Sequence, residues 1–173
     1  MSDPKAKIIS YKDIPKIREK ARRLGKKIIF LTGFFDLYHV GHAAMLAWAN
    51  SQGDILFIGL GPDAAAKAWK GEGRPIYNEA DRAYVLACHQ SVDYVVILRE
   101  PIRSDKINFR KAFRLISPHI FLAVSTDPGG MQAERRKMTK EIGAKFKIFS
   151  PFPHKRRKKP STSETLIKIR RYD

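Results

Sequence analysis

The stretch GFFDLYHVGH, residues 33–42, decides how the chain folds, because it joins an apolar run to the start of an amphipathic segment. The preceding run, KIIFLT at 27–32, is short and continuously apolar, which is typical of a strand buried on both faces of a parallel sheet. The following segment, 41–52, has the composition of a helix. The sequence therefore predicts a strand, a turn and a helix here, with two histidines in the turn.

The same alternation continues along the rest of the chain. Further strands are predicted at 54–60, 93–98, 119–124 and 145–150, and helices at 62–69, 78–90, 105–116 and 130–143. Strands and helices that alternate at this length imply right-handed crossover connections. We therefore predict an α/β fold of the doubly wound, Rossmann-like type, with a five-stranded parallel sheet and helices on both faces.

The length of 173 residues fits a single domain, 1–173. Residues 1–26 are predicted to be an N-terminal helical extension with a helix at about 12–24, and a closing helix is expected at about 162–171. Two segments do not fit the alternation of strands and helices. They are KGEGRPIY at 70–77 and a basic, proline-rich loop at 150–160. The loop contains the run HKRRKK, which is interpreted as a solvated segment, with phosphate collection or nucleic-acid contact as alternatives.

The composition narrows the class of partner and the cellular compartment. The formal net charge of +17 favours polyanionic partners such as nucleotides, phosphorylated metabolites, nucleic acid or anionic lipid. The single cysteine, Cys88, lies in the apolar run YVLACHQ and is expected to be a small buried core residue. One cysteine allows no internal disulfide, and no apolar run approaches the roughly 20 residues of a membrane span. We expect a cytoplasmic protein that does not enter a membrane.

The two histidines are best explained as phosphate ligands. In an open parallel sheet, ligands bind beyond the carboxyl ends of the strands, which is where the turn at 33–42 is predicted. Gly33 lets a ligand approach the backbone, and Gly41 is expected to let the chain turn into the helix. A helix start carries roughly half a positive charge and unpaired N–H groups. His39 and His42 can both direct ring N–H donors at one phosphate group bound there.

Other roles for these histidines fit the sequence less well. Either one alone would be explained by a structural role beside a core strand. Zinc requires three or four ligands, and the remaining histidines, 89, 119 and 154, lie in segments expected elsewhere. A general base needs a nucleophile, and no serine or cysteine lies beside the pair. We therefore predict no protein-built metal site.

These residues resemble the HxGH nucleotidyltransferases of the cytidylyltransferase type. The resemblance is carried by TGFFDLYHVGHAAML, by WKGEGRPIYNEADRAYVLACHQSVDYVVI and by STSETLIKIR, and it spans roughly residues 8–171. Within this superfamily the chain is most similar to the adenylyltransferase domain of ADP-heptose synthases. It is more distantly similar to glycerol-3-phosphate cytidylyltransferases and to FAD synthetases.

The resemblance implies a reaction. A phosphate oxygen of an acceptor attacks the α-phosphorus of a nucleoside triphosphate in line, and pyrophosphate leaves without a covalent enzyme intermediate. The expected donor is ATP, with CTP as the alternative, and the expected acceptor is heptose 1-phosphate or a similar phosphorylated sugar. Mg²⁺ is expected to bridge the triphosphate oxygens. The resemblance also implies a homodimer.

The resemblance further implies which residues form the site. His39, His42 and Lys70 are the expected catalytic residues. The expected nucleotide- and phosphate-binding residues are Thr32, Gly33, Phe34, Phe35, Gly41, Arg74, Ser161, Thr162 and Ser163. A secondary set comprises Asp36, Lys67, Arg82 and Asp127. Plainer alternatives exist where the residues alone are considered: a structural turn residue for Asp36, a solvated lysine for Lys67, an ion-pairing helix residue for Arg82, and a helix cap for the Ser/Thr run at 161–163.

One stretch departs from the pattern. The heptose enzymes carry a Lys-Gly-Gly-Asp-like segment where this chain has AVSTDPGG at 123–130, so the acceptor is the least determined part of the resemblance. Two other function classes stay open on the sequence alone, a basic nucleic-acid-binding protein and a nucleotide-binding relative without turnover. The first is disfavoured because the chain has no recognised nucleic-acid motif.

Overall fold

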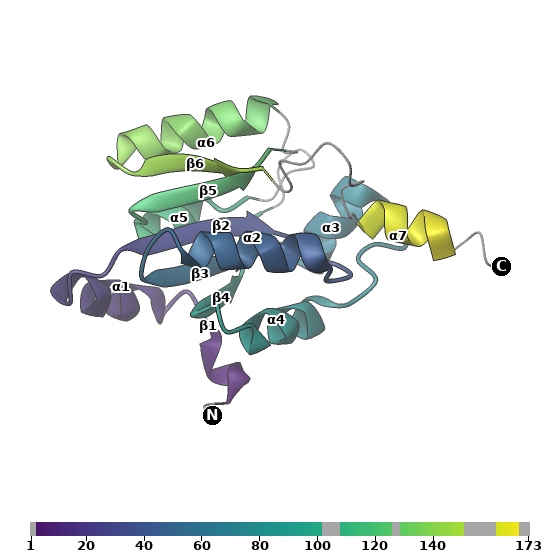
Figure 1. Ribbon diagram of the computed structural model, residues 1–173, viewed down its shortest axis with the longest axis horizontal. Helices are drawn as coiled ribbons and strands as arrows, with labels where there is room; N and C mark the ends of the chain where they lie inside the picture. Colours follow the sequence, from purple (N-terminus) through teal and green to yellow (C-terminus); the bar gives the residue numbers. More distant parts are fainter. Residues whose placement is uncertain (1–2, 102–107, 126–128, 151–161, 170–173) are drawn as a thin grey trace.

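A single parallel sheet of six strands, in the order β1-β4-β3-β2-β5-β6, organises the protein (Figure 1). The structure is a computed structural model that describes residues 3–101, 108–125, 129–150 and 162–169. The strands are β1 (Ile8–Ile9), β2 (Ile28–Gly33), β3 (Ile55–Leu60), β4 (Tyr94–Ile97), β5 (Ile120–Val124) and β6 (Lys145–Phe149). The five predicted strands are confirmed, and β1 is an additional edge strand that pairs with β4.

Helices follow the strands in the predicted alternation. They are η1 (Pro4–Lys7), α1 (Ile14–Arg23), α2 (Val40–Asn50), α3 (Asp63–Lys70), α4 (Glu79–Cys88), α5 (Arg110–Ile116), α6 (Gly129–Glu141) and α7 (Thr162–Ile169). The first 26 residues are thus not purely helical, because a two-residue strand lies between η1 and α1.

The core has two layers because alternate strand residues point to opposite faces of the sheet. Along β2, Ile28 and Phe30 pack with α1, α3 and α5, whereas Ile29 and Leu31 pack with α2 and α4. Figure 1 shows these helices on the two sides of the sheet, with α6 beside β6. Fully burying one such side chain contributes about 1.5–3 kcal/mol, so both faces stabilise the sheet. The predicted doubly wound α/β fold is confirmed.

Strand β2 occupies the point where the strand order reverses. It pairs with β3 on one side and with β5 on the other. The chain leaves β2 toward β3 and β4 and later returns to β5 and β6 on the opposite side. The turn at 33–42 therefore begins at the carboxyl end of the strand at the switch point, where ligands bind in sheets of this kind.

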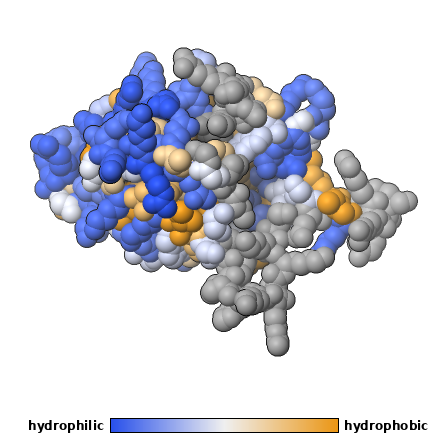
Figure 2. All heavy atoms as spheres, turned by 90° about the horizontal axis from the view of Figure 1, so that it is seen from above, coloured by the Kyte–Doolittle hydropathy of each residue, from blue (hydrophilic) through white to orange (hydrophobic). Residues whose placement is uncertain are grey.

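The surface differs from the expectation at Cys88, whose thiol is exposed rather than buried. Helix α4 turns Ala83, Leu86 and Ala87 toward the sheet, and the helical period then places residue 88 on the outer side. Elsewhere, the surface over α6 is largely hydrophilic in the view of Figure 2. Among the described residues, no helix combines the length and the apolar character that crossing a membrane requires.

Candidate functional site

The turn between β2 and α2 takes its shape from residues that are not glycine. Phe35 and Leu37 have positive φ values of 53° and 47°. Gly41 instead lies in the first turn of α2 and is not among the glycines with positive φ, so the expectation that it makes the turn was wrong. Gly33 is required for space, since a Cβ there would lie 2.8 Å from Cε2 of the buried Phe35 ring. The turn is therefore fixed by close packing around Phe35.

His39 and His42 lie face to face at the start of α2. Their ring centroids are 3.9 Å apart and the rings are nearly parallel, at 15°. Nδ1 of His39 accepts a hydrogen bond from the Gly41 N–H at 3.1 Å, and Nδ1 of His42 accepts one from the His39 N–H at 3.4 Å. Each neutral ring therefore carries its proton on Nε2. The pair caps the helix through Nδ1 and keeps Nε2–H as a donor for a ligand.

Both imidazoles are neutral at physiological pH. Burial lowers the pKa of His42 to about 3, and the neighbouring His39 and Lys70 contribute to this shift. Burial also lowers the pKa of His39 below its usual value. A phosphate ligand therefore meets two neutral N–H donors at the start of α2, not two imidazolium cations.

This low pKa predicts a pH-dependent stability. Between the unfolded pKa of 6.5 and the folded pKa of about 3, the unfolded chain binds a proton at His42 that the folded chain does not. The free energy of unfolding should therefore fall as the pH falls through this window, with a slope of up to about 1.4 kcal/mol per pH unit from this group. Urea unfolding of the wild type and of His42→Gln from pH 7 to 4.5 measures this contribution as the difference in slope. Equal slopes in the two proteins would contradict it.

Two further cations lie close to the histidine pair. Lys70, at the end of α3, has its Nζ 5.9 Å from the centroid of the Phe34 ring and 6.0 Å from that of Trp69. Burial and the charge of Arg74 lower the pKa of Lys70. An Nη of Arg74 lies 2.9 Å from Oδ2 of Asp36, and the two side chains are 10% and 2% exposed. Asp36 thus interacts with Arg74, Lys70 and His42, so one carboxylate is shared by two cations and an excess of positive charge remains for an anionic ligand.

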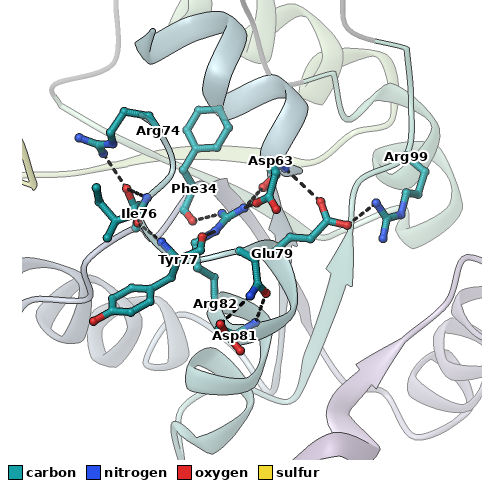
Figure 3. Close-up of polar contacts among 12 residues, drawn as sticks. Phe34, Asp63, Arg74, Ile76, Tyr77, Glu79, Asp81, Arg82 and Arg99 are labelled. Atoms are coloured by element: carbon teal, nitrogen blue, oxygen red, sulfur yellow. Dashed lines mark hydrogen bonds and ion pairs between the residues drawn. The ribbon is translucent and has the colours of Figure 1, made fainter. Parts of the chain in front are cut away.

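Arg82 is a buried structural centre, only 2% exposed. Its guanidinium donates to the carbonyls of Phe34, of Gly61 at 3.0 Å and of Tyr77 at 2.9 Å, and to the Asp63 carboxylate at 2.6 Å (Figure 3). These contacts join the ends of β2 and β3 to the segment before α4. The geometry favours the ion-pairing role considered above, because these protein acceptors engage the guanidinium.

The other predicted site residues have different surroundings. The Thr162 hydroxyl donates to the carbonyl of Asp36 at 2.6 Å and so attaches the start of α7 to the turn. Ser163 is exposed beside it. Lys67 is exposed and pairs with Glu72 at 3.1 Å, away from these contacts. The predicted residues Ser161 and Asp127, and the loop at 150–160 apart from Ser150, lie outside the described residues.

The residues that follow β2 would face a ligand mainly with backbone. The side chains of Phe34 and Phe35 are buried in the core, and the Gly33 carbonyl accepts from the Gly61 N–H at 2.9 Å. The hydroxyl of Thr32 is buried, with no hydrogen-bond partner in the described part of the chain. No group of three or more His, Cys, Asp or Glu residues suited to a metal ion is found within the described ranges.

Sequence reasoning missed two acidic residues that support the site. Asp63, the first residue of α3, binds Arg82 as described above, and its own N–H donates to Oε2 of Glu79 at 3.0 Å. The other Glu79 oxygen lies 2.5 Å from an Nη of Arg99. Acidic residues are favoured at helix starts, and both lie in the first turn of a helix, which is the signal that marks them.

Sequence comparison relates this chain to a known protein family. Residues 30–165 match the sequence model of the cytidylyltransferase-like family. The bifunctional protein HldE of Aliarcobacter butzleri is 45% identical over 121 residues, which are 70% of this chain and 24% of that protein. HldE of Pelobacter propionicus is 34% identical over 149 residues, 86% of this chain and 29% of that protein. The chain thus spans about a quarter of the length of these relatives.

Solved structures share the fold at lower identity. A lipopolysaccharide core biosynthesis protein from Thermoplasma volcanium superposes with a TM-score of 0.60 at 24% identity, covering 75% of this chain and 99% of that one. A pantoate-beta-alanine ligase from Francisella tularensis gives a TM-score of 0.61 at 14% identity, covering 95% of this chain and 77% of that one. These likenesses concern the fold. Since the family match covers most of the chain, including the histidine turn, the protein belongs to the cytidylyltransferase-like family.

Proposed function

We propose that this protein is a nucleotidyltransferase that transfers a nucleoside monophosphate from ATP to a phosphorylated sugar such as heptose 1-phosphate and releases pyrophosphate. The observation that carries the proposal is the pair of neutral Nε2–H donors of His39 and His42 at the switch point of the sheet. Membership of the cytidylyltransferase-like family and the similarity to HldE proteins support it. The preference for ATP over CTP and for a heptose rests on the resemblance of the motifs.

The geometry fits a transfer in which the protein forms no covalent bond to the substrate. An acceptor phosphate oxygen attacks the α-phosphorus in line, and the pyrophosphate oxygen leaves on the opposite side. Such reactions are accelerated by positioning and by stabilisation of the charge that develops on the phosphoryl oxygens. In this proposal His39 and His42 donate to those oxygens, while Lys70 and Arg74 neutralise the triphosphate.

Magnesium enters this proposal with the nucleotide. Mg²⁺ bound to nucleotides is held largely by phosphate oxygens and water, with few protein carboxylates. Asp36 does not fit as a magnesium ligand, because its oxygens accept from the N–H groups of Ile76 and Tyr77 and pair with Arg74. No step is therefore assigned to a metal held by the protein.

Pyrophosphate release tests the proposed function directly. The protein is incubated with Mg²⁺, each of ATP, CTP, GTP and UTP, and a panel containing heptose 1-phosphate, other hexose and heptose phosphates and glycerol 3-phosphate. We expect release with ATP and a sugar 1-phosphate. Release only with CTP and glycerol 3-phosphate would move the protein to the cytidylyltransferase alternative, and no release by folded protein that binds nucleotide would reject catalysis.

We also propose a homodimer in the cytoplasm, and the outer face of α4 supports the dimer. Tyr84 and Val85 are 44% and 46% exposed, and Cys88 is exposed one turn further on. A cleft of about 460 Å³ between this helix and the N-terminal segment is lined by Lys5, Ile8, Ala80, Asp81, Ala83, Tyr84 and Ile97. Contiguous exposed apolar side chains commonly mark protein interfaces.

The dimer proposal predicts the effect of a charge on this face. Val85→Lys should convert a dimer into a monomer in sedimentation velocity, because burying an unpaired charge opposes association. Ala64→Lys, an exposed position on α3, serves as the control and should leave the sedimentation coefficient unchanged. A wild-type monomer at micromolar concentration, or a dimer that survives Val85→Lys, would contradict this placement.

A further inference from the structure

We propose that Asp36 is a positioning residue, whose buried carboxylate holds residues 74–77 against the histidine turn and thereby fixes the Arg74 guanidinium at the phosphate site. The catalytic consequence rests on the proposed function. We call the contacts of the Asp36 carboxylate with residues 74–77 the Asp36 clamp. The existence of this clamp does not depend on the proposed function and is tested separately.

The carboxylate of Asp36 organises backbone as well as a side chain. Asp36 is 3% exposed. Both of its oxygens accept from the Ile76 N–H at 3.1 Å, and Oδ1 also accepts from the Tyr77 N–H at 3.2 Å. A carboxylate that receives two consecutive backbone N–H groups fixes the direction of that backbone, because each bond to a charged acceptor is stronger than a neutral one.

Side-chain packing does not account for the position of this segment. The side chains of Ile76 and Tyr77 are 45% and 52% exposed, so neither is inserted in the core. The only carboxylate that these two N–H groups contact among the described residues belongs to Asp36. The N–H groups of Ile76 and Tyr77 and the guanidinium of Arg74 therefore converge on one buried carboxylate.

The same carboxylate orients Arg74. An Nη of Arg74 lies 2.9 Å from Oδ2 of Asp36, and the arginine side chain is 10% exposed. The Arg74 charge also helps to lower the pKa of Lys70. Holding Arg74 by Asp36 keeps a second cation beside Lys70 against their mutual repulsion. The pair is thus assembled before a phosphate ligand arrives.

The Tyr77 residue is held from a second side as well. Its carbonyl accepts from Nε of Arg82 at 2.9 Å, while its N–H donates to Asp36. At the other end of the segment, Gly71 and Gly73 have positive φ values of 91° and 76° and no atoms within 4 Å of the position of a Cβ. The loop is therefore anchored at 74–77 and open around its glycines.

Hydrogen exchange of the wild type without any substrate tests the clamp first. We expect the amides of Ile76 and Tyr77 to exchange at least about 100-fold more slowly than that of Gly73, although their side chains are exposed. Asp36→Asn should accelerate exchange at Ile76 and Tyr77 at least tenfold, since the amide group carries no charge and has one acceptor oxygen. Glu72→Gln, a carboxylate-to-amide change in the same loop, is the matched control and should leave both rates unchanged. Equal rates at residues 73, 76 and 77 of the wild type, or unchanged rates in Asp36→Asn, would overturn the proposal.

Kinetics then test the link to Arg74. Asp36→Asn and Arg74→Met should each lower kcat/KM for the triphosphate by about 10–100-fold, the range expected for one hydrogen bond to a charged group. Because Asp36 acts through Arg74, the double variant should be no worse than Arg74→Met alone. Additive losses would show that Asp36 acts independently and would overturn its positioning role. A wild type without pyrophosphate release rejects the proposed function, whereas the exchange experiment still decides whether the clamp exists.

Discussion

Replacing His39 by asparagine should lower kcat by about 10²–10³-fold, the usual loss when one donor to a developing oxyanion is removed. His39 uses Nδ1 to accept the Gly41 N–H and cap α2, and in the proposed mechanism it uses Nε2–H on the phosphoryl oxygens. Asparagine is itself a good cap residue, and its Oδ1 can replace Nδ1, but it has no donor in the position of Nε2. The substitution therefore separates the two roles of one ring.

The controls for this prediction come from the chain itself. Stability in urea should change by no more than about 0.5 kcal/mol, because the helix cap is retained. His89→Asn is the matched control, since Nδ1 of His89 likewise accepts a backbone N–H, that of Ser91 at 3.2 Å. Its kcat should equal that of the wild type in the pyrophosphate assay. If His39→Asn retains full kcat, His39 is only a capping residue.

Replacing Arg82 by methionine should produce the largest loss of stability, about 3–5 kcal/mol, the cost of removing one partner from a buried ionic contact. The variant leaves the carbonyls of Phe34, Gly61 and Tyr77 without their donor, and it leaves Asp63 without its cation. Because domains of this kind are stable by only about 5–15 kcal/mol, the variant should be close to unfolding at physiological temperature.

Equilibrium unfolding in urea measures this effect, with circular dichroism as the signal. Arg114→Met, an exposed arginine of α5, is the matched control and should change stability by less than about 0.5 kcal/mol. Arg82→Lys should recover only part of the loss, because a single ammonium group cannot reach acceptors spread around a planar guanidinium. A loss below about 1 kcal/mol in Arg82→Met would show that water replaces the missing donors.

Much of the fold could be predicted because its signals are local. Strands β3, β4 and β5 are uninterrupted apolar runs, β2 is apolar up to Thr32, and β6 combines three apolar residues with two lysines. The segments between these strands have helical composition. Strand β1 could not be predicted because two isoleucines are too few for a recognisable pattern. They form a strand only through pairing with Val95 and Val96 of β4. Cys88 was misjudged because its neighbours are apolar, whereas the period of α4 turns it outward.

In the candidate site, too, contacts between residues close in sequence could be predicted, whereas contacts between distant residues could not. The histidine pair lies within four residues and shares one helix start, so its role could be argued from spacing. The contacts of Asp36 with Ile76 and Tyr77 join residues 40 and 41 positions apart. The sequence around Arg82 cannot distinguish a helix arginine that binds phosphate from one that binds protein carbonyls. Its partners at Phe34 and Gly61 exist only once β2 and β3 are paired.

The chain positions of these contacts have an evolutionary consequence. Within the described ranges, the hydrogen-bond and ion-pair partners of the Asp36 and Arg82 side chains all fall between positions 34 and 77, although the sheet continues through β5 and β6. The side-chain network of Asp36 and Arg82 is therefore contained within residues 34–82, and the second half of the chain reaches the histidine turn through the β2–β5 pairing and through the Thr162 hydroxyl, which donates to the Asp36 carbonyl. Changes in the sequence after β4 therefore leave the residues of this network unchanged. Recombination after β4 would then transfer this network as one unit.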